Sequence, residues 1–186
     1  MNASAFVKVS KAEFWDFVQA QAEGKFEYER GRIVQQMTGG THAHAILIQR
    51  FTFALMRDLD PSANTVTSQS RGVDTPVTIR YPDAVVERVG SDAKSLATSA
   101  PLVLVEVLSP NTEKLDLNVK PQEYTSLPSL LAYIVASQDR PECLVWQRAA
   151  DGGFADDPAR IAGPGAQIVV EGLGLRLELD EIYRGI

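Results

Sequence analysis

The chain has 186 residues, of which 45% are hydrophobic and 23% are charged. This size and composition exclude a disordered or fibrous chain and suit one globular domain, residues 1–186, with a core large enough to fold unaided. The formal net charge of −6 argues against a protein that coats nucleic acid through bulk electrostatics, although a local site where metal ions offset phosphate charge stays open.

The cysteine content and the first residues bear on the compartment. Cys143 is the single cysteine, so no intrachain disulfide can form, which fits a reducing compartment. Residues 1–8 lack the basic segment and apolar block of a secretory signal, and no apolar run approaches the roughly 20 residues that cross a bilayer. We therefore expect a soluble cytoplasmic protein.

Hydrophobic periodicity divides the chain into helices and strands, with Gly and Pro at the turns. The first helical pattern has Ser10 before it as a candidate N-cap. In chain order we expect a helix over 11–22, a hairpin from 26 to 37 that turns at Gly31, the main helix over 44–59 and strands within 64–80. There follow central strands over 84–86 and 101–108, a polar loop over 111–118, a short helix through Tyr124, a hairpin over 131–136 and 142–147, and a strand or helical turn over 177–183.

Strands and helices intermingle without strict alternation, and we see no repeat, linker or low-complexity segment. This order predicts an α+β (α/β) fold with a central mixed β-sheet flanked by helices, and with additional N-terminal and C-terminal β-hairpins.

Two acids lie in segments that otherwise look like buried strands. Asp83 follows Pro82 and precedes an apolar run, and Glu106 lies in the middle of a second apolar run. A buried carboxylate is normally protonated, paired with a cation or bound to a metal. Their separation of 106 − 83 = 23 positions allows a strand, a turn and the next strand. On adjacent strands the pair would suit a hard divalent cation such as Mg²⁺.

Three residues beyond Glu106 recur every four positions, namely Asp116, Lys120 and Tyr124. A helix that includes all three would place them on one face. Pro121 is tolerated only in the first turn of a helix, which would instead put Lys120 at the helix start and Asp116 in the preceding loop.

Taken together, these motifs resemble the family named "Putative restriction endonuclease", long catalogued as a domain of unknown function, within the PD-(D/E)XK nuclease superfamily. The resemblance covers nearly the whole chain and depends on the order and spacing of short motifs. The matching motifs are Phe26-Glu27-Tyr28-Glu29-Arg30-Gly31, His44, Pro82-Asp83, Glu106-Val107-Leu108-Ser109-Pro110, the spaced Asp116, Lys120 and Tyr124, Leu130-Leu131-Ala132-Tyr133-Ile134-Val135, and Tyr183-Arg184-Gly185-Ile186.

The resemblance implies a restriction-endonuclease-like core that hydrolyses DNA. Asp83 and Glu106, with the carbonyl oxygen of Val107, would bind Mg²⁺ or Mn²⁺, and Glu27 would complete the acidic shell. The usual lysine is replaced by Leu108, which cannot polarise water or neutralise a phosphate. The family pattern moves this lysine to the following helix, where the matching residue is Lys120. The implied catalytic residues are Asp83, Glu106, Lys120 and Glu27.

Simpler interpretations remain for the acids and for Lys120. Asp83 could cap a turn after the proline. Glu106 could pair with an arginine such as Arg80. Glu27 could lie on a solvated strand face, and Lys120 could be a surface lysine.

The remaining polar candidates have simpler interpretations too. His44 could cap the main helix, or it could line the cleft and contact substrate. Tyr124 could pack in the core or line the cleft. A zinc site that uses His42 and His44 lacks four ligands at a suitable spacing.

Three functions fit these residues. The first is a Mg²⁺-dependent DNA endonuclease, and the second is a nuclease-like binding or regulatory module without turnover, which Leu108 and the acidic balance favour. The third is hydrolysis of RNA or another phosphodiester by the same ions. We also expect a homodimer, because a twofold pair could present two sites to the two strands of a duplex.

Overall fold

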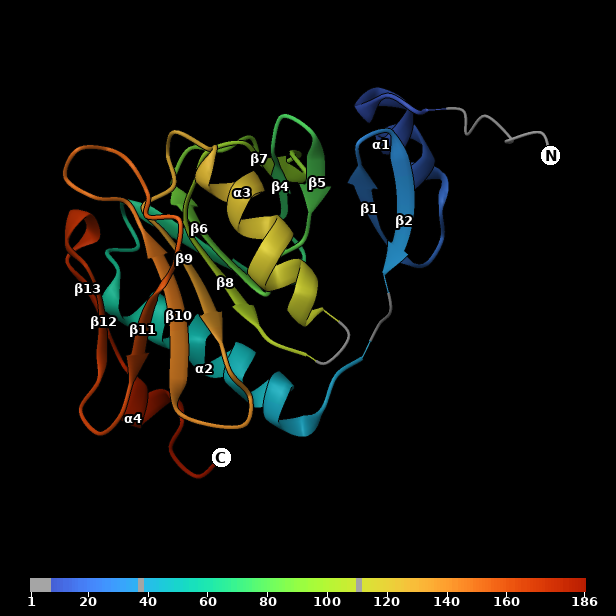
Figure 1. The fold of residues 1–186 in the computed structure, drawn as a ribbon. Helices are drawn as coiled ribbons and strands as arrows, with labels where there is room; N and C mark the ends of the chain where they lie inside the picture. Colours follow the sequence, from blue (N-terminus) through green and yellow to red (C-terminus); the bar gives the residue numbers. More distant parts are fainter. Residues whose placement is uncertain (1–7, 37–38, 110–111) are drawn as a thin grey trace.

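The computed structural model describes residues 8–36, 39–109 and 112–186, and the expectations for residues 1–7, Met37, Pro110 and Asn111 lie outside these ranges. The larger sheet has six strands: β3 (Asn64–Ser68), β6 (Ala84–Arg88), β8 (Pro101–Val107), β9 (Ala132–Ala136), β10 (Glu142–Gln147) and β11 (Ala159–Ala162). Their order is β11-β10-β9-β8-β6-β3 (Figure 1). Strands β8 and β9 are parallel and the other neighbours are antiparallel, so the sheet is mixed.

A second sheet contains the N-terminal hairpin. Its five strands are β1 (Lys25–Glu29), β2 (Arg32–Gln36), β4 (Gly72–Asp74), β5 (Thr78–Arg80) and β7 (Ala97–Thr98), in the order β2-β1-β5-β4-β7. At the hairpin turn Gly31 has a φ of 94°, which glycine adopts without the steric cost of a Cβ. Helix α1 (Lys11–Ala20) lies beside the hairpin (Figure 1), and Ser10 forms a capping box with Glu13 at its start.

Two helices cover opposite faces of the six-stranded sheet (Figure 1). Helix α2 (His42–Asp58) packs on the face that carries Val103 and Val105. Helix α3 (Lys120–Thr125) packs on the face that carries Leu104. Side chains alternate between the faces of a strand, so Glu106 points to the side of α3. The α2 side also holds β12 (Gln167–Val170), the 3₁₀ helix Glu171–Leu173, β13 (Leu175–Glu178) and α4 (Leu179–Ile182).

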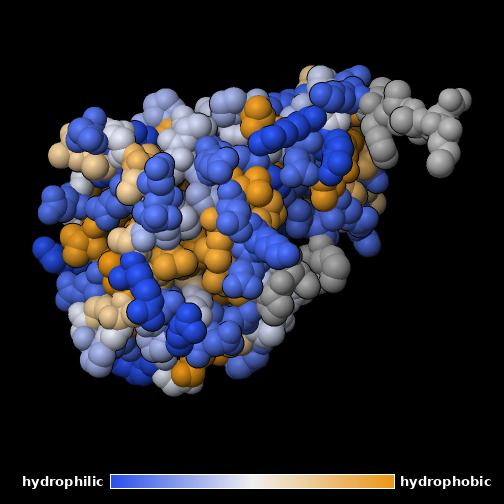
Figure 2. All heavy atoms as spheres, in the orientation of Figure 1, coloured by the Kyte–Doolittle hydropathy of each residue, from blue (hydrophilic) through white to orange (hydrophobic). Residues whose placement is uncertain are grey.

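The face that carries α3 is only partly covered. Figure 2 shows hydrophilic residues over most of this side of the molecule, with a hydrophobic area in its middle. Partly buried hydrophobic residues pack against the core on this side, namely Leu108, Leu117, Leu144 and Phe154. The single short helix therefore leaves part of the core within reach of solvent.

Residues 113–119 before α3 are helical, which corrects the described part of the loop that was expected over 111–118. Leu115–Val119 form a π-helical turn, and the backbone N–H of Lys120 donates to the carbonyl of Leu115 five residues earlier. Pro121 cannot donate a hydrogen bond and would clash with the carbonyl four residues before it in a regular α-helix. The wider turn accommodates Pro121 at the start of α3. Asp116 therefore belongs to a helical turn and not to a loop.

The other predicted elements are present with shifted ends. The main helix begins at His42, two residues before its predicted start, and ends at Asp58, one residue before its predicted end. The segment expected as a strand or a helical turn contains both, because β13 ends where α4 begins. The mixed α+β fold with a hairpin near each end is confirmed. In the described residues, no helix has the length and apolar character to cross a membrane.

Candidate functional site

Strands β6 and β8 bring Asp83 and Glu106 together, as the sequence predicted. Ala84 pairs with Val105 in the antiparallel ladder, so the same register places Asp83 opposite Glu106. Oδ2 of Asp83 accepts a 2.8 Å hydrogen bond from the backbone N–H of Val107. Both acids are buried, with exposed fractions of 9% for Asp83 and 5% for Glu106.

Lys120 lies between Glu106 and Asp116. Its Nζ is 2.7 Å from Oε1 of Glu106 and 2.7 Å from Oδ1 of Asp116. The two charged groups of Lys120 and Asp116 are close enough for an ion pair, but they form no hydrogen bond. Oδ1 of Asp116 accepts no hydrogen bond from any residue that the structure describes. The hydroxyl of Tyr124 donates to Oε1 of Glu106 at 3.5 Å, the long limit of a hydrogen bond. The structure therefore places Lys120 and Tyr124 at the same carboxylate.

Burial and excess negative charge determine the ionisation of this cluster. Burial raises the pKa of Glu106 to about 8, the ammonium of Lys120 opposes this shift, and the charges of Asp116 and Asp83 add to it. Burial is the largest single effect on the pKa of Lys120 and would lower it, but the charges around the ammonium together outweigh burial, with Glu106 contributing most and Tyr124, Asp116 and Glu27 adding to it. The pKa of Lys120 therefore lies well above its ordinary value, and the ammonium stays charged at neutral pH.

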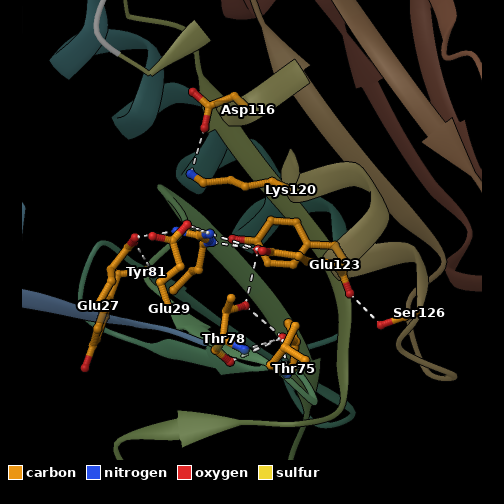
Figure 3. A network of polar contacts seen from close by, with 12 residues as sticks. Glu27, Glu29, Thr75, Thr78, Tyr81, Asp116, Lys120, Glu123 and Ser126 are labelled. Atoms are coloured by element: carbon orange, nitrogen blue, oxygen red, sulfur yellow. Dashed lines mark hydrogen bonds and ion pairs between the residues drawn. The ribbon is translucent and has the colours of Figure 1, made fainter. Parts of the chain in front are cut away.

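A second buried network surrounds Arg80, next to the first. The guanidinium contacts Glu27 at 3.0 Å, Glu29 at 3.2 Å and Glu123 at 2.7 Å. Glu27 also accepts a 3.2 Å hydrogen bond from the backbone N–H of Tyr81. Figure 3 shows these acids from close by, with Asp116 and Lys120 beside them. The network ties the N-terminal hairpin to α3.

This arrangement corrects three of the simpler interpretations. Arg80 does not pair with Glu106, because its described contacts go to three other acids while Glu106 pairs with Lys120. Glu27 does not lie on a solvated strand face, since it is 3% exposed. Lys120 is not a surface lysine either, because its exposed fraction is 5%.

His44 lies beside the first acid of the pair and does not cap α2. Its Nε2 is 3.6 Å from Oδ2 of Asp83. The N-cap is Thr41, whose side chain accepts a hydrogen bond from the backbone N–H of His44. His42 is exposed. In the described part of the chain, no three or more His, Cys, Asp or Glu side chains are grouped to hold a metal ion.

The two acids can still accept a hard cation. Each uses one carboxylate oxygen inside the protein, and no described residue hydrogen-bonds to Oδ1 of Asp83 or Oε2 of Glu106. Mg²⁺ commonly uses one or two protein carboxylates and keeps several waters, so this donor set fits the ion. The surrounding charge fits as well. The two networks together contain six acids and two cations, so they carry an excess of 6 − 2 = 4 negative charges if all groups ionise. The acids are Glu27, Glu29, Asp83, Glu106, Asp116 and Glu123, and the cations are Arg80 and Lys120.

Sequence reasoning missed the role of two residues. Glu123 was not singled out, and Arg80 was named only as a structural partner. The available signal was the position of Glu123, three residues after Lys120 on the same helix, where it lies close to that face. The signal for Arg80 was a charged residue in a strand whose other residues are buried.

The comparisons with known proteins bear on the family and the fold. A family model described as "Putative restriction endonuclease" matches residues 12–180. An uncharacterized protein of Synechocystis sp. is 28% identical over 187 residues, which cover 99% of this chain and 96% of that protein. The crystal structure of "a putative nuclease belonging to DUF820" from Anabaena variabilis has a TM-score of 0.72 at 14% identity, covering 90% of this chain and 94% of that chain. The expected restriction-endonuclease-like core is therefore confirmed.

Proposed function

Because the chain belongs to the family described as "Putative restriction endonuclease", we propose that it is a Mg²⁺- or Mn²⁺-dependent endonuclease that hydrolyses DNA phosphodiester bonds. One observation carries the proposal. Asp83 just before β6, Glu106 on β8 and Lys120 on α3 meet in one buried cluster. A structural ion pair needs only two partners, whereas a metal-dependent hydrolase needs acids for the ion and a cation for the phosphate.

The metal ligands in this proposal are the carboxylates of Asp83 and Glu106 and the carbonyl oxygen of Val107. Glu27 belongs to the acidic shell, because its charge acts on Lys120. When bound, the ion would lower the pKa of a coordinated water and neutralise charge on the leaving oxygen. The chain's own ammonium, Lys120, would stabilise negative charge that develops on the phosphate or hold the attacking water.

Two further residues lie beside the acid pair. His44 is partly accessible beside Asp83, with a side chain 16% exposed, and its ring nitrogen can donate to a phosphate oxygen. Tyr124 is fully buried and holds Glu106 through its hydroxyl. We assign His44 to phosphate binding and Tyr124 to orientation of the acid.

A second function is favoured by one observation. Glu106 already has a cationic partner 2.7 Å away in Lys120, so the buried pair is partly neutralised without a metal ion. A nuclease-like binding or regulatory module without turnover would have this property. Hydrolysis of RNA or another phosphodiester is chemically equivalent to the first function and differs in the substrate alone.

The test compares cleavage of plasmid DNA and of a structured RNA in Mg²⁺, in Mn²⁺ and in EDTA. The variant is Glu106→Gln, which keeps the shape of the side chain and one acceptor for Lys120. The control is Glu87→Gln, because Glu87 is equally buried in an ion pair with Arg71 at the other end of β6. We expect metal-dependent cleavage by wild type and by the control, and none by Glu106→Gln. If wild type cleaves no polynucleotide, the nuclease proposal is refuted and the binding module without turnover is supported.

We propose further that the chain forms a homodimer and that residues 1–186 act as one domain. Pairing of β1 with β5 and the Arg80 network join the N-terminal hairpin to the rest of the chain. One cooperative unfolding transition is expected, and two separate transitions would contradict a single domain. Light scattering at micromolar concentrations should give the mass of a dimer, and a monomer at all concentrations would refute the assembly.

A further inference from the structure

The guanidinium of Arg80 is buried, with 2% of the residue exposed, and Arg80 is more completely buried than either Glu27 or Glu123. Nε donates to Oε2 of Glu123 at 2.7 Å and the adjacent terminal nitrogen donates to Oε1 at 3.1 Å. The other contacts go to Glu27 and Glu29 on β1. Two parallel bonds between a planar guanidinium and a carboxylate fix direction as well as distance.

The partner of this two-pronged contact lies on the helix that carries the proposed catalytic lysine. Glu123 follows Lys120 by three residues, within one turn of α3. The hydroxyl of Thr78 also donates to Oε2 of Glu123 at 3.2 Å. Strand β5 therefore holds α3 through two side chains, Thr78 and Arg80. A helix anchored in this way cannot rotate or slide without breaking buried hydrogen bonds.

Arg80 also lies close to the first acid along the chain. It precedes Asp83 by three residues, and the residue that follows it, Tyr81, donates a hydrogen bond from its backbone N–H to Glu27. Among the described residues, no hydrogen bond or ion pair joins Arg80 to Asp83, Glu106 or Lys120 directly. Its influence on them must pass through α3 and the start of β6.

We propose that Arg80 is a positioning residue, which holds α3 through Glu123 so that the ammonium of Lys120 stays at Glu106. This inference rests on the proposed function. A buried ion network is poor evidence for stability, because desolvation of the charges offsets most of their attraction. Its geometry is directional, because two parallel hydrogen bonds from the planar guanidinium fix the carboxylate of Glu123. The buried contacts of Arg80 therefore serve to fix the position of Lys120 and contribute little to the free energy of unfolding.

The test uses Glu123→Gln and Arg80→Lys, with Glu87→Gln as the matched control. Glu123→Gln removes the one carboxylate charge by which α3 contacts Arg80, and Arg80→Lys keeps the positive charge but loses the planar fork. Both should lower kcat on the order of 10²-fold, the effect of a displacement of about 1 Å at a catalytic group. KM and the affinity for Mn²⁺ should change little, since Asp83 and Glu106 are intact. The control should keep the kcat of wild type even where it lowers thermal stability equally.

A second measurement does not depend on activity. Competitive acetylation of lysines, read by mass spectrometry, reports how accessible each amine is. Acetylation of Lys120 should be slow in wild type and in Glu87→Gln and rise severalfold in Glu123→Gln and Arg80→Lys. Unchanged acetylation of Lys120 in both variants would overturn the inference. A wild type that cleaves nothing would refute the proposed function, while acetylation of Lys120 would still decide whether Arg80 holds α3.

Discussion

At the scale of single residues, the buried charges divide between two cations of different shape. The planar guanidinium of Arg80 contacts three carboxylates at once, whereas the compact ammonium of Lys120 lies between two. An ammonium can move between a carboxylate and a phosphate oxygen because its donors have no fixed plane. The chemistry of each side chain therefore suits its place, with arginine in the support and lysine at the acid pair.

Replacement of Lys120 tests the proposed chemistry directly. Lys120→Ala should abolish or greatly reduce cleavage, because no other described cation is within 4.0 Å of Glu106. Lys120→Arg should rescue poorly, since a planar guanidinium does not match the space of a compact ammonium. Plasmid cleavage and Mn²⁺ binding are measured in parallel, and metal binding should persist. Full activity of Lys120→Ala would show that the lysine of this family site does not act from α3.

The thiol of Cys143 gives a prediction about pH. Burial raises its pKa to about 12, so the thiolate that reacts with disulfide reagents is scarce in the folded protein. The folded pKa is above the unfolded value of about 8.5. The stability from this group is therefore complete below about pH 8.5 and is lost as the pH rises towards 12.

Titration with a colorimetric disulfide reagent at pH 8 checks this prediction. The thiol should react slowly in the native protein and at the rate of a free cysteine after addition of guanidinium chloride. Fast reaction of the native protein at pH 8 would contradict the burial of Cys143.

At the scale of elements, the helical segment before and within α3 shows how one residue shapes the site. Pro121 interrupts the regular hydrogen bonds, and the π-helical turn Leu115–Val119 absorbs the interruption. The turn keeps Asp116 and Lys120 in contact across it. Single π-turns are frequent at functional sites, which agrees with the position of this one beside Glu106.

The start of α1 provides a prediction for an element remote from the acid pair. Ser10→Ala removes the side-chain oxygen that accepts a hydrogen bond from the backbone N–H of Glu13. Loss of such an N-cap costs about 1 kcal/mol of unfolding free energy, and for a chain of this size lowers Tm by about 2–4 °C. Thermal denaturation followed by circular dichroism measures the change. Ser10→Asp should keep most of the stability, and equal losses in both variants would show that the cap is not the cause.

At the scale of the whole molecule, excess buried acid links metal binding to stability. An ion that binds the folded state alone stabilises it by about 2.7 kcal/mol at one hundred times its Kd, equivalent to a rise in Tm of about 5–10 °C. Mn²⁺ should produce this rise in wild type and in Glu87→Gln, and EDTA should reverse it. Asp83→Asn, which can still accept the hydrogen bond from Val107, should show little rise. A rise of equal size in Asp83→Asn would place the ion elsewhere.

Local patterns in the sequence determined the elements. Periodicity placed the main helix to within two residues at each end, and Ser10 marked the start of α1 because a side-chain cap and its helix are neighbours in sequence. The unusual positions of Asp83 and Glu106 in apolar runs predicted adjacent strands, which β6 and β8 form.

Only the tertiary structure decided which cation each buried acid meets. Arg80 reaches Glu27 across 53 residues and Glu123 across 43, and Lys120 reaches Glu106 across 14. Partner choice among buried charges follows from strand order and helix rotation, which set distances between groups far apart in sequence, and no local pattern records those distances.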